Sequence, residues 1–516
     1  MTIYLIILTI FALVMPFISY YLGWLVLVSF VPFLFLLNYL SSSKYSSKKQ
    51  FLIIWLVGVF SFYGVLGWSL QTNPQRWAFV AGWQAITGQW LIYTVFVLLF
   101  SIQYVVFAAL YLKLKPKLLD WRSYLIIPSI WVISEAARSL FFSLVMYGKG
   151  SLVGLHWNFG VLGAAASVTP LVYLSRLVGM FGLSFVVVMI GVSIYWIIKK
   201  QYKLPVIILS IISLVTFISW IAWRVPVNSK QIQVGYVQLA QNFDNYENGD
   251  SYFDELSNMV KNRSTKNDIL VLPEYSNFFV DTGKSYLAHQ IAGDVTSDDG
   301  LIITSVSNDV DSHTHKNRLE IYNPKGEVVT TQDKTFLIPI GEYLPNLVVG
   351  LYKLGGMNQA LKMHEDARIV AQGTDPNKPI TVRGISLASL ACSGAITPEL
   401  YRGLVNGGAE IMTNSASLGA FTDATLYHAQ SRQFAHFMAV ANSRPFVQSA
   451  GGAYSFVIDN NGDFVSQTDN LGTNYDSVTL QVTKSKTPYT VLGEWVIFFS
   501  LSAVLYFYFR PREIKD

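Results

Sequence analysis

The sequence predicts a helical membrane domain of eight spans joined to an α/β sandwich that lies outside the membrane. Hydrophobic residues make up 52% of the 516 residues and charged residues only 13%, whereas about a quarter of the residues in a soluble domain are charged. The long apolar stretches are confined to residues 1–223 and 489–509. Residues 230–485 have the composition of a soluble domain, and strand-like and helix-like segments alternate along them, which is the pattern of an α/β fold.

Eight apolar segments are long enough to cross a bilayer, which takes about 20 residues of helix. Two of them lie in the first forty residues, with Pro16 and a turn at residues 20–24 between them. The others lie near residues 51–70, 90–112, 122–142, 179–198, 204–223 and 489–509. The chain begins without a charged segment or a small-residue cleavage site, so we expect the first segment to be a span rather than a removable signal peptide. The sequence thus predicts seven helices before the soluble part and one after it.

Lysine and arginine residues cluster in the loops that follow the even-numbered spans. They are Lys44, Lys48, Lys49, Lys113, Lys115, Lys117, Arg122, Lys199, Lys200, Lys203, Arg510, Arg512 and Lys515. Because cytoplasmic loops carry an excess of Lys and Arg, we expect both termini in the cytoplasm and residues 230–485 outside it. The formal net charge of +5 belongs largely to these loops, which favours contact with anionic lipid and argues against a nucleic-acid partner.

The soluble part combines strands, hairpins and helices. Strand-like segments occur at residues 231–239, 269–272, 300–306, 384–391, 410–413 and 446–449. Two hairpins are expected to turn at residues 323–326 and 460–462, where Asn and Gly stand between alternating apolar residues. A capping-box spacing at residues 251–254 and the stretch 424–442 indicate helices. Together these signals predict an α/β sandwich whose sheets are covered by helices.

Cys392 is the single cysteine of the chain and ends the apolar segment 384–391, just before a helix-like segment at 397–402. A helix N-terminus lowers the pKa of a thiol and makes it a better nucleophile. A lone cysteine is nevertheless more often a small buried side chain than a catalyst. Two charged residues upstream favour a catalytic cysteine over a merely buried one, because Glu274 follows a strand and Lys334 follows a hairpin. Acyl transfer needs a nucleophile, a base and a cation for the oxyanion, and these three residues supply those groups.

The order of Glu274, Lys334 and Cys392, with Pro-Glu six residues after the cysteine, resembles the Glu-Lys-Cys triad of the nitrilase (carbon-nitrogen hydrolase) superfamily. With eight spans and the soluble part between the seventh and eighth, the chain is similar to the apolipoprotein N-acyltransferase family within it. The segments that carry the likeness are 334–345, 392–402, 427–430 and 443–445. The resemblance covers nearly the whole chain and implies an αββα fold for residues 230–485.

The resemblance also implies a role for each site residue. Cys392 would be the nucleophile that forms a thioester, Glu274 the general base, and Lys334 the cation that faces the oxyanion. Glu342 would be a second acid that supports the site, and the backbone at Cys392 and Ser393 would help to form the oxyanion hole. No metal ion or cofactor is implied.

A membrane phospholipid, typically phosphatidylethanolamine, would be the acyl donor implied by the family. The acceptor would be the free α-amino group of the N-terminal diacylglyceryl-cysteine of an apolipoprotein, and the two substrates would use one site in turn. The expected location is the plasma (inner) membrane of a bacterium, and we expect a monomer.

The chain departs from the family's usual motifs around the nucleophile. Ser393 and Gly394 stand where the family usually has Tyr-Glu, and residues 414–419 read Asn-Ser-Ala-Ser-Leu-Gly instead of Asn-Asp-Ala-Trp-Phe-Gly. A tryptophan that the family often carries after its first outer strand also has no counterpart, since Phe243 and Tyr246 are the aromatic residues nearby. Two alternatives therefore stay open: a membrane-anchored amidase with the same triad, and a catalytically impaired relative that binds lipid or lipoprotein.

Three further segments allow more than one interpretation. The apolar, glycine-containing stretch 344–361 suits a lid that dips into lipid or ordinary core packing. Glu135 and Arg138 lie three residues apart within a span, where an internal ion pair costs less than two lone charges. His313 and His315 lie in a polar loop without further ligand spacing, which favours a solvated loop over a zinc site.

Overall fold

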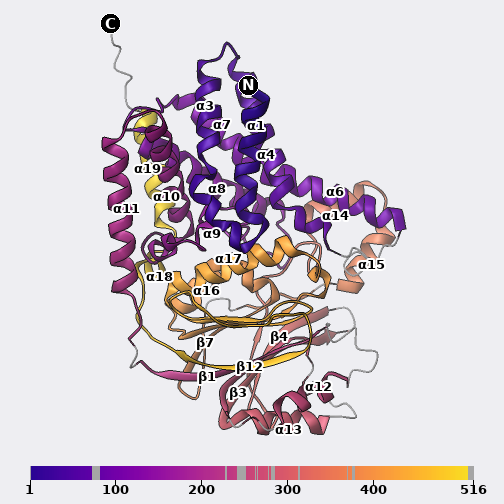
Figure 1. Ribbon diagram of the computed structural model, residues 1–516. Coiled ribbons are helices and arrows are strands. Elements are labelled where there is room, and N and C mark those ends of the chain that lie inside the picture. Colours follow the sequence, from indigo (N-terminus) through magenta and orange to yellow (C-terminus); the bar gives the residue numbers. More distant parts are fainter. Residues whose placement is uncertain are drawn as a thin grey trace.

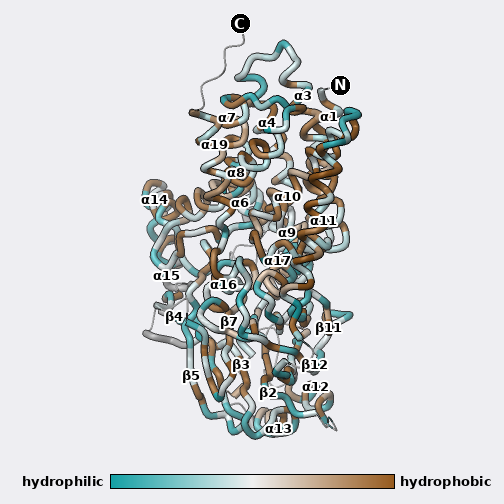
Figure 2. The backbone as a smooth tube through the Cα atoms, turned by 90° about the vertical axis from the view of Figure 1, so that its left-hand side faces the viewer, coloured by the Kyte–Doolittle hydropathy of each residue, from teal (hydrophilic) through white to brown (hydrophobic). Residues whose placement is uncertain are grey.

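The structure is a computed structural model that describes residues 2–72, 82–226, 229–240, 251–261, 263, 265–276, 278–279, 285–311, 314–368, 370–374 and 378–509. Figure 1 shows a bundle of long helices above a two-layered sandwich of strands, with α17 lying between them. Hydrophobic residues dominate the helical bundle, and hydrophilic residues are concentrated on the sandwich and at the far end of the bundle (Figure 2). The segments around Trp77, Phe243, Tyr246 and His313, and the C-terminal cations, lie outside the described residues.

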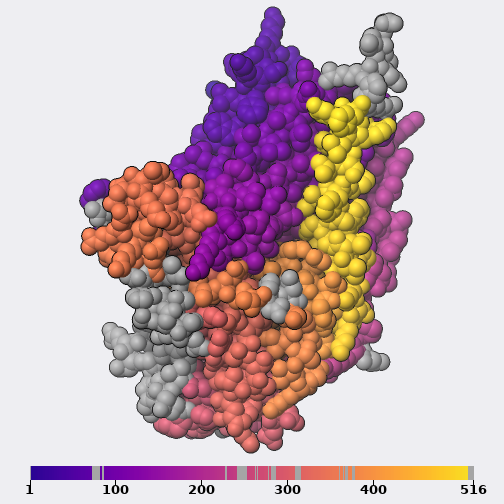
Figure 3. Space-filling model, turned by 180° about the vertical axis from the view of Figure 1, so that it is seen from behind, coloured from indigo at the N-terminus to yellow at the C-terminus, as the bar shows by residue number. Residues whose placement is uncertain are grey.

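The bundle consists of apolar helices. They are α1 (Thr2–Ile18), α2 (Val26–Ser29), α3 (Val31–Ser42), α4 (Ser47–Val65), α6 (Gly82–Phe100), α7 (Ile102–Leu114), α8 (Ser123–Val145), α9 (Leu162–Ala166), α10 (Ser175–Ile198), α11 (Lys203–Ala222) and α19 (Trp495–Phe509). The last of these packs against α8 although it comes from the other end of the chain, and Figure 3 shows it lying along the bundle.

Six helical segments among the described residues are long and apolar enough to cross a membrane. They are Tyr20–Ser42, Ser47–Val65, Ile86–Leu114, Ser123–Val145, Pro170–Ile198 and Lys203–Ala222. The helices α1 and α19 are apolar but shorter, at 17 and 15 residues. Six of the eight predicted segments thus have the length of a span, and the count of eight stays a prediction.

Glu135 and Arg138 are both fully buried in α8, but neither relies on the other as its hydrogen-bond partner. Glu135 Oε1 accepts hydrogen bonds from Trp131 Nε1 at 2.8 Å and from the Leu162 N–H at 3.0 Å. The Arg138 guanidinium donates to the Phe159 carbonyl. The two charges therefore fix the chain that runs from α8 to α9, instead of forming the expected direct ion pair.

The sandwich contains two six-stranded sheets. Their strands are β1 (Gln231–Gln238), β2 (Asn267–Glu274), β3 (Thr296–Asp311), β4 (Thr314–Tyr322), β5 (Val328–Asp333), β6 (Ile380–Val382), β7 (Ile385–Ala391), β8 (Ile411–Ser417), β9 (Phe446–Gly451), β10 (Phe456–Ile458), β11 (Phe464–Gln467) and β12 (Asn474–Gln481). The strand orders are β12-β1-β2-β3-β4-β5 and β11-β10-β9-β8-β7-β6. The central strands β1, β2 and β3 run parallel, as do β7, β8 and β9. The predicted strands and both predicted hairpins are confirmed.

Alternating apolar residues from both sheets fill the space between them, including Ile269, Val271, Leu387, Ile411 and Val447. The helices α12 (Ser251–Val260) and α13 (Ser285–Val295) pack on the first sheet, and α16 (Pro398–Asn406) and α17 (Thr425–Asn442) pack on the second. Because the carboxyl ends of parallel strands lie at one edge of a sheet, the ends of β2, β7 and β8 can bring side chains from both sheets into one place.

α17 joins the sandwich to the bundle through polar contacts as well as apolar packing. Gln430 Nε2 donates to the Val65 carbonyl and Gln433 Nε2 to the Pro16 carbonyl, each at 2.8 Å. Ser167 Oγ donates to the Gln433 carbonyl at 2.9 Å. These bonds fix α17, and the strands that it covers, against the end of the bundle.

Two helices project from the junction of the bundle and the sandwich. They are α14 (Asn346–Leu354) and α15 (Asn358–Arg368), which form a lobe beside the bundle (Figure 3). α14 has no buried residue, and Leu347, Leu351 and Leu354 are exposed by 52%, 57% and 87%. Ordinary core packing therefore holds at the two ends of the stretch 344–361, where Leu344 and Leu361 are buried, and is wrong for α14.

Candidate active site

Cys392 lies at the tip of β7, where the strand turns sharply into a helical segment. It opens the 3-10 turn η5 (Cys392–Ile396), which leads into α16. Its φ of +43° is in the left-handed region that side-chain-bearing residues seldom adopt. The Sγ atom lies 3.5 Å from the carbonyl oxygen of Ser417 at the end of the neighbouring strand β8.

Glu274 is the last residue of β2 and approaches the thiol from the other sheet. It is 4% exposed, the Cys392 thiol lowers the pKa of its carboxyl group, and Oε2 accepts the Ser417 N–H at 3.2 Å. The backbone of Ser417 thus contacts both the acid and the nucleophile. A base within hydrogen-bond reach of its proton is the geometry that general base catalysis requires.

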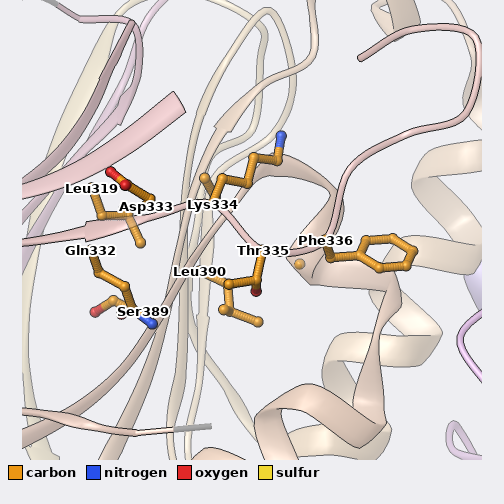
Figure 4. A pocket seen from close by; sticks show the side chains of 10 residues that line it. Leu319, Gln332, Asp333, Lys334, Thr335, Phe336, Ser389 and Leu390 are labelled. Atoms are coloured by element: carbon orange, nitrogen blue, oxygen red, sulfur yellow. The ribbon is translucent and has the colours of Figure 1, made fainter. Parts of the chain in front are cut away.

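Lys334 follows the last residue of β5 and faces the site because strand side chains alternate. Its neighbour Asp333 points the other way, toward Lys316 at 2.8 Å and Arg318 at 2.7 Å. Figure 4 shows Lys334 extending away from Asp333 beside a cavity of about 10 Å³, which has room for one water at most. Lys334 Nζ lies 3.5 Å from Glu274 Oε1.

Glu342 holds Lys334 in place from the opposite side. Glu342 Oε1 lies 2.7 Å from Lys334 Nζ and accepts from Asn317 Nδ2 at 2.9 Å. Glu342 Oε2 accepts the Ile338 N–H at 2.9 Å, and Ile340 within this turn has a φ of +69°. The turn therefore positions the Glu342 carboxylate next to the Lys334 ammonium. Asn317 was not predicted, because nothing in the sequence distinguishes it from other strand residues and its partner lies 25 positions away.

The charges at this site act strongly on one another because Glu274 and Lys334 are buried. Burial raises the pKa of Glu274, Lys334 lowers it and Glu342 raises it, with a net rise. Burial lowers the pKa of Lys334, but Glu274 and Glu342 outweigh this effect and hold that pKa well above its ordinary value. Burial and then Glu274 raise the pKa of Cys392. The expectation that a helix N-terminus lowers the thiol pKa is therefore wrong, because desolvation and a carboxylate dominate.

Ser393 and Gly394 fit their positions for steric reasons. Ser393 Oγ donates to the Phe336 carbonyl at 2.9 Å, which ties the 3-10 turn to the segment after Lys334. A Cβ on Gly394 would lie 2.4 Å from the Cβ of Leu390, so this backbone has no space for a side chain there. A glutamate at position 394 would require the turn to move.

An apolar cavity of about 210 Å³ lies between the bundle and the sandwich and borders the turn that carries Glu342. Its walls include Ile92, Tyr93 and Phe96 of α6 and Ile338, Pro339 and Phe421 of the sandwich. Trp68 also lines it, and its ring centroid lies 5.5 Å from that of Tyr427. Burial raises the pKa of Tyr427, and Cys392 and Lys334 act on the same pKa, which places this phenol within electrostatic reach of both. Tyr427 was predicted only as part of a segment and not as a site residue.

Two family models together match most of the chain. Residues 11–193 match the apolipoprotein N-acyltransferase N-terminal domain, and residues 233–486 match the carbon-nitrogen hydrolase domain. The apolipoprotein N-acyltransferase of Shewanella oneidensis is 24% identical over 446 residues, which are 80% of this chain and 81% of that protein. The apolipoprotein N-acyltransferase of Geobacter metallireducens is 25% identical over 351 residues, and the match spans 63% of its length.

Among solved structures, a carbon-nitrogen hydrolase from Helicobacter pylori G27 is 16% identical and covers 55% of this chain and 96% of its own, with a TM-score of 0.35. An amidase from Nesterenkonia sp. is 16% identical and covers 50% of this chain and 92% of its own, with a TM-score of 0.32. Both family models match this one chain, and the Shewanella oneidensis apolipoprotein N-acyltransferase aligns with it over 446 residues. The chain therefore belongs to the apolipoprotein N-acyltransferase family, with a domain of the carbon-nitrogen hydrolase type.

Proposed function

We propose that the chain transfers an acyl group from a membrane phospholipid to the α-amino group of the N-terminal diacylglyceryl-cysteine of apolipoproteins, through a thioester on Cys392. One observation carries this proposal: the turn that holds Glu342 against Lys334 also lines, through Ile338, an apolar cavity whose walls come from both the bundle and the sandwich. A water-soluble substrate gains little from an apolar cavity. An acyl chain is stabilised there, because each CH₂ that it buries contributes about 0.8 kcal/mol to the free energy of binding.

In the first half-reaction the Cys392 sulfur attacks the ester carbonyl of the donor. Glu274 takes the thiol proton as the C–S bond forms, and the carbonyl electrons move to oxygen, where Lys334 faces the negative charge. Collapse of this intermediate breaks the ester C–O bond, and Glu274 returns the proton to the departing alkoxide of the lysophospholipid. The contact of both Glu274 and the thiol with the Ser417 backbone and the fixed ammonium of Lys334 support these assignments.

In the second half-reaction the amine of the apolipoprotein attacks the thioester. Glu274 takes a proton from the attacking nitrogen, the C–N bond forms, and the C–S bond breaks to return the sulfur, which regains its proton from Glu274. Donor and acceptor occupy the same site in turn, so the lysophospholipid leaves before the apolipoprotein enters. Glu342 keeps Lys334 in position in both halves, and no metal ion or cofactor takes part.

The proposed topology has eight spans, with α1 and α19 as the two short ones. Residues 1–223 and 489–509 lie in the inner membrane, and residues 230–485 form the extracytoplasmic catalytic domain. Both termini are cytoplasmic. The support is the set of lysines and arginines on the loops at the end of the bundle farthest from the sandwich, together with the positive-inside tendency of such loops. The protein acts as a monomer.

The deciding experiment is intact mass measurement of the purified protein after incubation with phosphatidylethanolamine in detergent. We expect a single acyl adduct that hydroxylamine removes and that is absent from Cys392→Ser and Glu274→Gln. Transfer of that acyl group to a diacylglyceryl peptide completes the test. Release of free fatty acid without transfer would indicate a hydrolase of the amidase type, and the lack of any adduct on a folded protein would indicate a lipid-binding relative.

A further inference from the structure

The peptide group between Cys392 and Ser393 has an orientation that the chain must hold against its own preference. Cys392 adopts a φ of +43°, and a left-handed conformation at a residue other than glycine persists only where its surroundings impose it. Ser393 is the second residue of the 3-10 turn, where an N–H has no acceptor within the turn. This N–H is therefore available to a ligand.

Asn414 is the side chain that contacts this peptide group. It lies on β8 in register with Leu390 of β7 and has no exposed surface. Its Nδ2 atom lies 3.3 Å from the carbonyl oxygen of Cys392. A carbonyl only accepts hydrogen bonds, so the NH₂ end of the amide faces Cys392.

Tyr401 is the residue behind Asn414. Its hydroxyl donates to the Thr413 carbonyl at 2.8 Å and lies 3.5 Å from Asn414 Oδ1, and its ring is fully buried. The space on the other side is equally restricted, because a Cβ on Gly394 would lie 3.2 Å from Asn414 Oδ1. The amide is thus enclosed by a tyrosine and by a residue that has no side chain.

We infer that Asn414, supported by Tyr401, is a positioning residue that aims the Ser393 N–H at the oxyanion of the acyl-transfer intermediate. In a planar trans peptide the C=O and N–H bonds point in opposite directions. Holding the Cys392 carbonyl toward Asn414 therefore fixes the direction of the Ser393 N–H. A hydrogen bond to a carbonyl also polarises the N–H of the same peptide group. This inference rests on the proposed acyl-transfer function.

The test compares two reactions of the same thiol in the purified full-length protein. Acylation by p-nitrophenyl butyrate passes through an oxyanion, whereas alkylation by iodoacetamide does not and depends on the thiolate alone. In Asn414→Ala and Asn414→Leu we expect the p-nitrophenol burst rate to fall by about 10- to 100-fold, which is less than the loss of a whole oxyanion donor. The alkylation rate should stay within about threefold of the wild-type rate, since Glu274 is unchanged.

Asn442→Ala is the matched control. Asn442 is also a fully buried asparagine, and it bonds the Met438 carbonyl and Thr490 on the far side of α17. It should lower thermal stability and leave both rates unchanged. Tyr401→Phe, which retains the ring, should slow acylation less than Asn414→Ala and leave alkylation unchanged.

An equal fall of acylation and alkylation in the Asn414 variants would overturn the inference, because it would mean that Asn414 supports the thiol or the fold. Unchanged acylation would overturn it as well, and so would a wild-type protein that is alkylated but gives no burst. A wild-type burst with p-nitrophenyl butyrate but no adduct from any phospholipid would count against the proposed function only.

Discussion

Lys334 faces two carboxylates, Glu274 and Glu342, so the buried site carries one more potential negative charge than positive charge. A thiolate would add another, and the pKa of Cys392 is accordingly raised. In the proposed mechanism the thiol proton therefore moves to Glu274 while the sulfur attacks its substrate. The rate then depends on an ionised Glu274, whose own pKa is raised, and it should increase with pH through that pKa.

Glu342→Gln tests this electrostatic account. The Glu342 charge raises the pKa of Glu274, so its removal should lower that pKa and move the ascending limb of the pH–rate profile to lower pH. The maximal rate should fall by about tenfold or more, because Lys334 loses the charge-assisted bond that positions it. The measurement is the single-turnover acylation rate across pH, with Glu327→Gln, an exposed residue of the β4–β5 hairpin, as the control. A limb that stays in place or moves to higher pH would contradict the account.

The sequence order of Glu274, Lys334, Cys392 and Glu342 sufficed to predict that they form one site, and the structure places them together. Asn317 and Asn414 escaped prediction because they are ordinary strand residues whose partners are 22 to 25 positions away. The thiol pKa was predicted in the wrong direction because a helix N-terminus can be found in a sequence, whereas the burial of Cys392 depends on both sheets.

Helices and strands were predictable where the pattern is local. The hairpins between β4 and β5 and between β10 and β11 follow from Asn and Gly between alternating residues. The apolar segment 489–509 was expected to be one helix, but it divides at Gly493, which has a φ of +62°. There Glu494 accepts the N–H groups of Met180 and Phe181 at 2.8 and 3.0 Å. Only a contact between distant segments explains that break.

The lobe of α14 and α15 exposes large apolar side chains, among them Leu351 and Leu354. An amphipathic helix of this kind lies at a membrane surface with its apolar face in lipid. We predict that Leu351→Asp with Leu354→Asp slows acyl-enzyme formation from phospholipid in nanodiscs by about tenfold or more, given the cost of placing charges in lipid. Acylation by p-nitrophenyl butyrate in solution should not change.

The matched control for the lobe is Lys353→Asp, on the same helix, which changes charge without removing an apolar side chain. It should leave the nanodisc rate close to wild type. If the leucine variants slow both acyl donors equally, the lobe acts on the active site itself and not on the approach of lipid.

At the scale of the whole molecule, the proposed topology places the sandwich and the basic end of the bundle on opposite sides of the membrane. Because Cys392 is the single cysteine, Cys392→Ala gives a background free of thiols. Lys325→Cys, in the exposed turn of the β4–β5 hairpin, and Lys48→Cys, in the exposed first turn of α4, are equivalent changes at the two ends. In spheroplasts we expect a membrane-impermeant maleimide to label position 325 and to reach position 48 only after lysis. Labelling of position 48 in intact spheroplasts would reverse the orientation.

The raised pKa of Cys392 has a consequence for the lifetime of the protein. Oxidants and disulfides react with thiolates and hardly with protonated thiols, and the proposed topology places Cys392 in an oxidising compartment. A nucleophile that stays protonated until Glu274 accepts its proton resists sulfenic acid formation and mixed disulfides while it waits for a substrate. The chain has no second cysteine that could reduce an oxidised Cys392. Protection of Cys392 from oxidation therefore depends on its staying protonated.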